Sequence, residues 1–269
     1  MFIINNTCWG DYPLQEYAKN LKAEVEKLGV EVQLRTQNFD YYKGIKIRNL
    51  NGDGLILENK SKFIILHYGD NDTAELQALE QHPDCEGVIS VNRFKEQNLY
   101  NLELPYHEKK YLLADEMYAG DYCGSFDRLA NSGYFSGVLF PQRVEYFTEV
   151  QKHIPITVST DRLPQIEYFL KLKQYKVILS PPGGCDINTR DIECFGLGIP
   201  IVRDEYKYRT DLIPGIHYIS TGIVQEKGFK LFEDKQYLNN ISIQSREYYS
   251  TYIKNQPHFQ TIITNFLSI

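Results

Sequence analysis

Residues 177–202 read Val-Ile-Leu-Ser-Pro-Pro-Gly-Gly-Cys-Asp-Ile-Asn-Thr-Arg-Asp-Ile-Glu-Cys-Phe-Gly-Leu-Gly-Ile-Pro-Ile-Val, and this stretch decides the fold. It opens on an apolar run at 177–180, which is typical of a strand buried on both faces. A loop with two glycines follows, and residues 188–197 then predict a helix that Gly198 can end. A second apolar run at 199–202 returns to the sheet. The order strand, loop, helix, strand indicates a βαβ unit of a parallel sheet.

The same alternation continues on the N-terminal side of this unit. Strands are predicted at 138–140 and 156–159, and helices at about 143–153 and 163–172. Strands that alternate with helices call for a parallel sheet covered on both faces, and right-handed crossovers would make it Rossmann-like.

The first half of the chain shows a second α/β pattern. Residues 2–4 predict a strand, residues 13–28 an amphipathic helix that Gly29 stops, and residues 30–34 another strand. Further elements are expected as strands at 45–48, 55–57, 63–66 and 87–91 and as a helix at 73–81.

The domain organisation follows from these two patterns. Residues 95–132 lack clear periodicity, so a linker is expected within them. We predict an N-terminal domain over 1–115, a C-terminal domain over 116–245, and a C-terminal helix at 246–269 that packs back on the first domain. The expected fold is α/β, with two Rossmann-like domains whose parallel sheets face a central cleft, because ligands bind beyond the carboxyl ends of parallel strands.

Composition excludes several classes of protein. The 269 residues carry a formal charge of −6, which argues against a nucleic-acid partner because phosphate contacts favour basic domains. The five cysteines are scattered and form no Cys-x-x-Cys pair, so neither a disulfide framework nor a zinc site is indicated. No signal peptide or membrane-length apolar run is visible, so we expect a soluble, cytoplasmic protein.

The loop and helix within residues 177–202 have the chemistry of an anion site. Gly183 and Gly184 allow a tight turn and a close approach of the backbone to a ligand. Asn188 or Thr189 can act as the N-cap, and a helix N-terminus attracts negative charge. Arg190 in the first turn adds a full positive charge that can bind a phosphate through two hydrogen bonds.

Glu193 lies three residues after Arg190, on the same face of the predicted helix. Its carboxylate can accept hydrogen bonds from two vicinal ribose hydroxyls. A phosphate site and a diol acceptor one helical turn apart indicate a nucleoside-diphosphate ligand. The alternative is that Arg190 and Glu193 form only an ion pair on a solvated helix, and Arg143 can likewise be a merely structural arginine.

The pattern Gly-Gly…Thr-Arg-x-x-Glu-x-x-x-x-Gly-x-Pro-Ile-Val resembles the donor half of GT-B glycosyltransferases, especially the group-1-like and exostosin-like branches. Three neighbouring segments support the resemblance. Gly137 and Arg143 bracket the predicted strand at 138–140, residues 169–179 are similar to the helix and strand before the donor loop, and residues 245–249 are similar to the C-terminal helix. The resemblance covers about residues 134–255.

The resemblance implies a metal-independent glycosyltransferase that moves a sugar from a nucleoside-diphosphate sugar to a hydroxyl of a glycan or another acceptor, without a cofactor. The loop at 159–162 is expected beside the base. The implied donor-binding residues are Gly183, Gly184, Asn188, Thr189, Arg190, Glu193 and Arg143.

An inverting enzyme also needs a general base from the first domain. Asp70 or His67 is the candidate, since both follow a buried strand, and Asp11 is the reserve. A retaining enzyme needs no such base, His67 can be structural, and Asp70 can be a turn residue. Residues 70–72 have the Asp-x-Asp form of the metal motif of GT-A glycosyltransferases, but their context differs, so no metal is expected. A nucleotide-sugar epimerase and a non-catalytic nucleotide- or sugar-binding module remain as alternative functions.

Overall fold

A computed structural model describes the residues 1–6, 13–36, 41–46, 54–67, 78–79, 81–90, 108–118, 120, 122–181, 187–206, 211–253 and 264–268. The chain forms two compact units. Unit 1 comprises Met1–His107 and Gln256–Ile269, and unit 2 comprises Glu108–Asn255. The division between the units therefore lies a few residues before the predicted boundary at 115/116. Unit 2 also extends beyond its predicted end at residue 245.

The sheet of unit 2 is parallel throughout and runs in the order β9-β8-β10-β11-β12. In chain order this is 2-1-3-4-5, one of the two common orders of doubly wound α/β folds. The direction of winding reverses between β8 and β10, and that reversal creates the crevice where such sheets bind ligands. Its strands are β8 (Ala130–Ser136), β9 (Ile156–Ser159), β10 (Tyr175–Leu179), β11 (Ile201–Arg203) and β12 (Ile219–Ser220).

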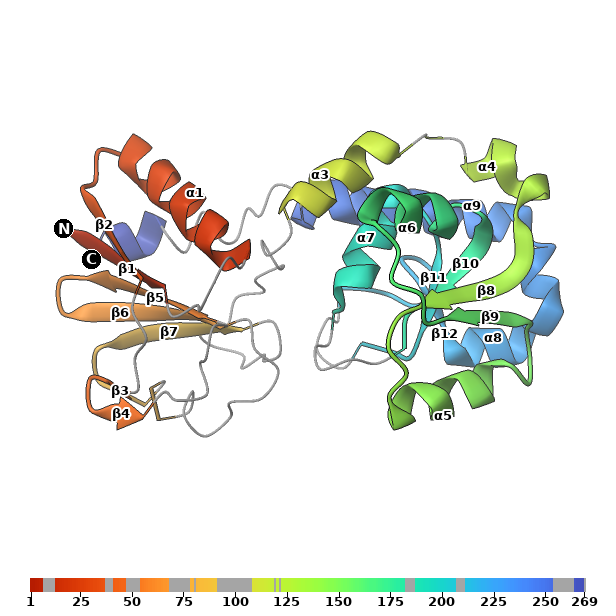
Figure 1. Ribbon diagram of the computed structural model, residues 1–269, viewed down its shortest axis with the longest axis horizontal. Coiled ribbons are helices and arrows are strands. Elements are labelled where there is room, and N and C mark those ends of the chain that lie inside the picture. The colour runs from red at the N-terminus through yellow and green to blue at the C-terminus, as the bar shows by residue number, and fades with distance from the viewer. Residues whose placement is uncertain are drawn as a thin grey trace. The chain divides into compact units, whose positions relative to one another are not determined.

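Helices cover both faces of this sheet (Figure 1). The helices α5 (Pro141–Val150) and α8 (Thr221–Lys227) pack together on one face over the apolar core. The helices α6 (Gln165–Leu172) and α7 (Thr189–Leu197) lie on the other face, where α3 (Glu108–Met117) and α9 (Lys235–Tyr248) pack against α7. The remaining helical turns are α4 (Tyr122–Ser125), η2 (Phe126–Arg128), η3 (Gly228–Phe232) and η4 (Tyr249–Ile253).

The first strand of unit 2 does not lie where the sequence predicts it. The apolar run Val138–Phe140 is not a strand but a loop whose side chains are 41–51% exposed, and the strand before it is β8. The sequence does not reveal β8, because Asn131, Ser132 and Gly133 interrupt its apolar pattern, although Tyr134 and Phe135 are buried. The division between the units at residues 107/108 lies within the range 95–132 in which a linker is expected, and α3, α4 and η2 occupy much of residues 108–128.

The sheet of unit 1 has the order β2-β1-β5-β6-β7 and is mixed. The expected α/β fold with parallel strand pairs is confirmed at β1–β2 and β6–β7, but β5 departs from it and pairs antiparallel with both β1 and β6. Only Lys60 and Ser61 separate β5 from β6, and such a short turn can join antiparallel strands but cannot span a parallel crossover. The strands are β1 (Phe2–Asn6), β2 (Val32–Thr36), β5 (Gly54–Asn59), β6 (Lys62–His67) and β7 (Cys85–Ser90).

Other parts of unit 1 complete its core. The predicted first helix is confirmed as α1 (Pro13–Lys27), and Gly29 follows it with a φ of 77°. A small hairpin of β3 (Tyr41–Tyr42) and β4 (Ile45–Lys46) places the Tyr42 ring edge-on against Phe63. The strand β3 is not among the strands predicted from the sequence. Most of the helix predicted at 73–81 lies outside the described residues.

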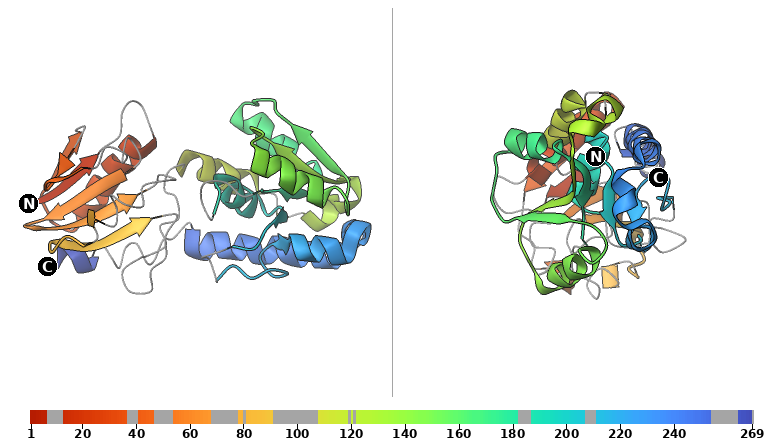
Figure 2. Two further views of the ribbon diagram at one scale, coloured as in Figure 1. Left: turned by 90° about the horizontal axis from the view of Figure 1, so that it is seen from below. Right: turned by 90° about the vertical axis from the view of Figure 1, so that its right-hand side faces the viewer.

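The C-terminal residues 264–268 belong to unit 1 (Figure 2). The rings of Phe2 and Phe266 lie edge-to-face with their centroids 5.9 Å apart. The side-chain amide of Asn59 donates a hydrogen bond of 2.8 Å to the carbonyl oxygen of Phe266. The chain thus ends on the sheet where it began, whereas α9 and η4 are parts of unit 2.

Gly198 ends α7 in the left-handed conformation, with a φ of 66°. A Cβ atom there would lie 2.7 Å from Cε2 of Tyr118, whereas one on Gly215, also left-handed at 79°, would meet nothing closer than 3.6 Å. We expect backbone strain to lower the free energy of unfolding of each alanine variant by about 1–2 kcal/mol. The clash with Tyr118 should lower that of Gly198→Ala by about 1–3 kcal/mol more. Urea unfolding measures both losses. Equal losses in the two variants would contradict the predicted clash.

Candidate functional site

The first turn of α7 lies at the point where the winding of the unit 2 sheet reverses. Asn188 is the N-cap, with extended backbone angles, and Thr189 begins the helix. Arg190 reaches from this turn to the end of the neighbouring strand, where its Nη2 donates a hydrogen bond of 2.6 Å to the carbonyl oxygen of Ser136. Ser180 follows β10 directly, so the helix start adjoins the carboxyl ends of both β8 and β10.

The Arg190 side chain is held by contacts on several sides. Its guanidinium carbon lies 4.3 Å from the centroid of the Phe135 ring, and its Nε lies 3.4 Å from the Tyr168 hydroxyl. A Cβ atom on Gly137 would lie 3.1 Å from Nη2 of Arg190. Glycine at position 137 therefore lets the guanidinium approach the backbone at the end of β8.

A second arginine lies against the same aromatic ring. The guanidinium carbon of Arg143, on α5, is 5.7 Å from the Phe135 centroid and 5.0 Å from the Phe140 centroid. Its Nη1 donates a hydrogen bond of 2.7 Å to the carbonyl oxygen of Val138, while its Nε is buried and has no hydrogen-bond partner. Burial, and next the positive charge of Arg190, lower the pKa of Arg143. Two like charges thus meet where an anion would relieve their repulsion. Gly137 and Arg143 both follow β8, so the prediction that they bracket a strand is wrong.

Glu193 lies one turn further along α7 and is only 4% exposed. The side-chain amide of Gln165, at the start of α6, lies 3.5 Å from Oε1 of Glu193. Every residue of α7 from Asp191 to Leu197 is buried. The helix is therefore buried and not solvated, because α3 and α9 pack against it.

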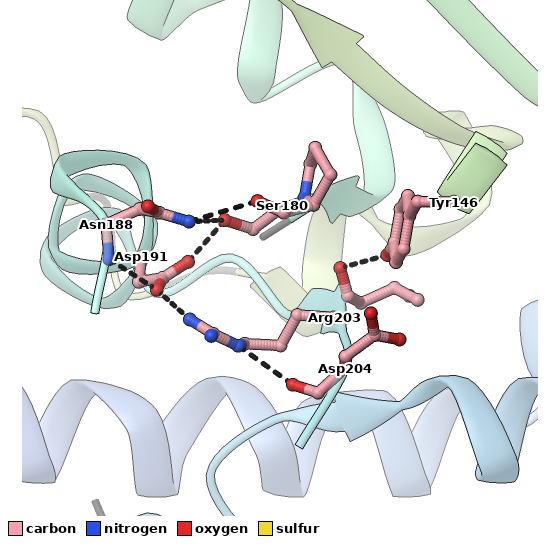
Figure 3. A network of polar contacts seen from close by, with 8 residues as sticks. Tyr146, Ser180, Asn188, Asp191, Arg203 and Asp204 are labelled. Carbon is pink, nitrogen blue, oxygen red and sulfur yellow. Dashed lines mark hydrogen bonds and ion pairs between the residues drawn. The ribbon is translucent and has the colours of Figure 1, made fainter. Parts of the chain in front are cut away.

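A buried polar network connects the start of α7 to the ends of β10 and β11 (Figure 3). The Asp191 carboxylate is fully buried and accepts hydrogen bonds from the Ser180 hydroxyl and, at 2.8 Å, from the backbone N–H of Asn188. It also forms an ion pair with Arg203, which is 3% exposed. Neither Asp191 nor Arg203 is among the site residues predicted from the sequence. An acidic residue three positions after an N-cap asparagine has the form of a capping box and could have identified Asp191.

Further contacts join this network to its surroundings. The Asn188 side-chain amide donates a hydrogen bond of 3.1 Å to the carbonyl oxygen of Pro181. Arg203 donates from Nε to the carbonyl oxygen of Asp204 at 3.0 Å, and its guanidinium carbon is 3.5 Å from the Tyr206 ring centroid. The network therefore connects the residues after β10, the start of α7 and the end of β11. No sequence pattern singles out Arg203 as the partner of Asp191.

Several residues predicted for the site lie outside the part of the chain that the structure describes. Gly183, Gly184, Asp70 and Asp11 lie outside the described residues, as does the Asp-x-Asp segment. His67 is the last residue of β6 and is paired with Gly54 and Ser90, but its side chain is not described. Within the described ranges, no group of three or more His, Cys, Asp or Glu side chains could hold a metal ion. None of the helices described there is long and apolar enough to cross a membrane.

The fully buried thiol of Cys194 predicts a loss of stability in alkali. Burial, and next the charge of Glu193, raise the pKa of Cys194 well above its ordinary value of 9.0. The unfolded chain ionises this thiol near pH 9 and the folded chain does not. This contribution to stability is therefore complete below about pH 9 and falls by about 1.4 kcal/mol per pH unit above it.

We expect Cys194→Ala to show a shallower fall between pH 9 and 10, because only the wild type has the buried thiol, whereas the tyrosines that ionise near pH 10 in the unfolded chain are common to both proteins. Urea midpoints of the wild type and the variant, measured from pH 7.5 to 10, provide the comparison. Parallel falls in the two proteins would show that the thiol is not responsible.

Comparison with known proteins gives a likeness of fold but no match in sequence. No family model matches the sequence, and no curated protein is significantly similar to it. A solved structure described as the crystal structure of an alpha1,3-fucosyltransferase aligns with 91% of this chain and 80% of its own, at 13% identity and a TM-score of 0.45. At that score the likeness carries no argument about function.

Proposed function

We propose that the protein is a glycosyltransferase that moves a sugar from a nucleoside-diphosphate sugar to an acceptor hydroxyl. The observation that carries the proposal is the pair of guanidinium groups, Arg143 and Arg190, on the Phe135 ring beside the N-terminus of α7. This pair lies at the carboxyl end of β8, where the strand order reverses and doubly wound sheets bind nucleotides. The motif in residues 183–202 supports the same function by its resemblance to GT-B donor sites.

The arginines and the helix N-terminus would stabilise the leaving diphosphate. A guanidinium has five N–H donors, and Arg190 uses its Nη2 for Ser136 and its Nε for Tyr168. Donors of Nη1 are then available to a phosphate oxygen. Negative charge grows on the diphosphate as the sugar leaves, so fixed positive charge at this place lowers the barrier. Arg143 would add charge from α5, and Gly183, Gly184, Asn188 and Thr189 would complete the donor site.

The nucleoside would lie on the α6 side of Arg190. Glu193 would accept hydrogen bonds from the ribose hydroxyls in place of its contact with Gln165. The loop after β9 would flank the base. This loop is tied to the end of β8, because the Ser136 hydroxyl donates a hydrogen bond of 3.3 Å to the carbonyl oxygen of Asp161. The residues proposed to contact the base, the ribose and the phosphates would therefore lie near the carboxyl ends of β8 and β9.

The acceptor and its activation would depend on unit 1. We keep Asp70 or His67 as the proposed general base of an inverting reaction, because His67 is the last residue of β6 and Asp70 comes three residues later in the sequence. The two arginines provide the positive charge that a metal ion supplies in other transferases. The proposed reaction therefore needs neither a metal nor a cofactor.

The experiment is a thermal-stabilisation screen with UDP, GDP, ADP and TDP at millimolar concentration. A ligand at 100 times its Kd stabilises the folded state by about 2.7 kcal/mol, so even weak binding raises Tm. The corresponding nucleotide-sugar is then incubated with candidate acceptors. Release of nucleoside diphosphate only with an acceptor supports transfer, an isomeric sugar without an acceptor indicates an epimerase, and stabilisation without turnover indicates a binding module. No stabilisation by any of the four contradicts the proposal.

A further inference from the structure

We propose that Asp191 is a positioning residue of the nucleotide site, an inference that rests on the proposed function. Its carboxylate fastens the N-cap of α7 to the ends of two sheet strands, and this attachment determines where Arg190 stands. Asp191 itself is fully buried and would not touch the nucleotide.

The three partners of Asp191 come from three separate segments. Ser180 follows β10, Asn188 precedes α7, and Arg203 ends β11 (Figure 3). Ser180 and Arg203 bond the carboxylate through their side chains, whereas Asn188 bonds it through its backbone N–H. The N–H contact acts on the main chain where α7 begins. Movement of Asp191 would therefore shift the first helical turn, and with it Arg190.

The ion pair with Arg203 also suits a site for an anion. An unpaired carboxylate one residue from Arg190 would repel a phosphate, but the nearly buried guanidinium of Arg203 offsets its charge. Asp191 can thus hold the backbone N–H of Asn188 at the helix start while the positive charge of Arg203 offsets its negative charge. Positioning matters because a displacement of about 1 Å can cost an enzyme about 100-fold in rate.

Three variants of the full chain distinguish the positioning of Arg190 by Asp191 from the effect of the Asp191 charge and from a general loss of stability. Asp191→Ala removes every contact, and Asp191→Asn keeps the shape and an acceptor oxygen without the charge. The double variant Asp191→Leu with Arg203→Met removes the ion pair without leaving a buried charge behind. Asp127→Ala, at an 86% exposed side chain, is the matched control. The probe is whichever of UDP, GDP, ADP and TDP stabilises the wild type, and calorimetry measures its Kd well below Tm.

We expect Kd to rise at least tenfold in Asp191→Ala and in the double variant, to stay within threefold in Asp191→Asn, and not to change in Asp127→Ala. Hydrogen exchange of residues 188–192 without ligand should be faster in Asp191→Ala than in Asp191→Asn. If Asp191→Ala does not fold, Asp191→Asn and the double variant still decide the matter.

Four results would overturn this inference. Wild-type affinity in the double variant would show that Asp191 contributes only stability. Binding by Asp191→Asn tighter than wild type would show that the charge, and not the position, acts on the ligand. A wild type that binds none of the four nucleotides would remove the proposed function and this inference with it, whereas nucleotide binding that Asp191→Ala leaves unchanged would remove the inference alone.

Discussion

Replacement of Arg190 by alanine is expected to weaken nucleoside-diphosphate binding by about 10- to 150-fold. The guanidinium lies at the N-terminus of α7 against Phe135, and hydrogen bonds to charged groups contribute about 1.5–3 kcal/mol each. Arg190→Lys keeps the charge but loses the planar fork and the flat stacking on the ring, so we expect an intermediate affinity. Calorimetry against the nucleotide selected by thermal stabilisation measures both variants.

The control for Arg190 is Arg128→Ala, which removes an exposed arginine from η2 and should leave Kd unchanged. Far-UV circular dichroism verifies that each variant is folded. If Arg190→Ala and Arg128→Ala bind the nucleotide equally well, Arg190 is only a structural clasp between α7 and the end of β8.

The second large effect is expected on stability. Arg203→Met should lower the free energy of unfolding of unit 2 by about 3–5 kcal/mol, because it leaves the Asp191 charge buried without its ionic partner. The same substitution together with Asp191→Leu should recover much of that loss, since well-packed apolar groups can replace a buried ion pair. Urea unfolding followed by circular dichroism gives the three values.

Lys227→Met is the matched control for Arg203→Met. Its ion pair with Asp234 has an N–O distance of 3.1 Å, but both side chains are about one-third exposed or more. Water and salt screen such a pair, so its loss should cost at most about 1 kcal/mol. Similar losses from Arg203→Met and Lys227→Met would mean that the buried pair contributes no more than a surface pair.

The regular parts of the fold could be predicted because their signals are local. The strand at 156–159, the helix α7 and its end at Gly198 follow from apolar periodicity and from the backbone freedom of glycine. The strand β8 was misplaced because its burial comes from neighbouring strands, whereas its own sequence is interrupted by small polar residues. The direction of β5 depends on a two-residue turn, which apolar pattern alone does not reveal.

Some features of the candidate site could also be predicted from local sequence, whereas others depend on distant segments. Residues 188–193 indicated a helix N-terminus with Arg190 and Glu193, because cap, charge and spacing are properties of consecutive residues. Their actual partners are distant in sequence: Arg190 bonds Ser136, and Asp191 pairs with Arg203. Such pairings depend on the order of the strands, since only the reversal between β8 and β10 brings residue 136 beside residue 190.

The sequence by itself determined that this is an α/β chain, where the strands β9, β10 and β11 and the helices α5, α6 and α7 lie, and which helix start carries an arginine suited to an anion. The tertiary structure alone decided that α7 is buried, that two arginines share the Phe135 ring, and that a buried ion pair stands behind the N-cap. The physical reason is the separation along the sequence between the residues that interact. Helix and strand patterns arise within a few residues, whereas burial and charge pairing arise where the folded chain brings distant segments together.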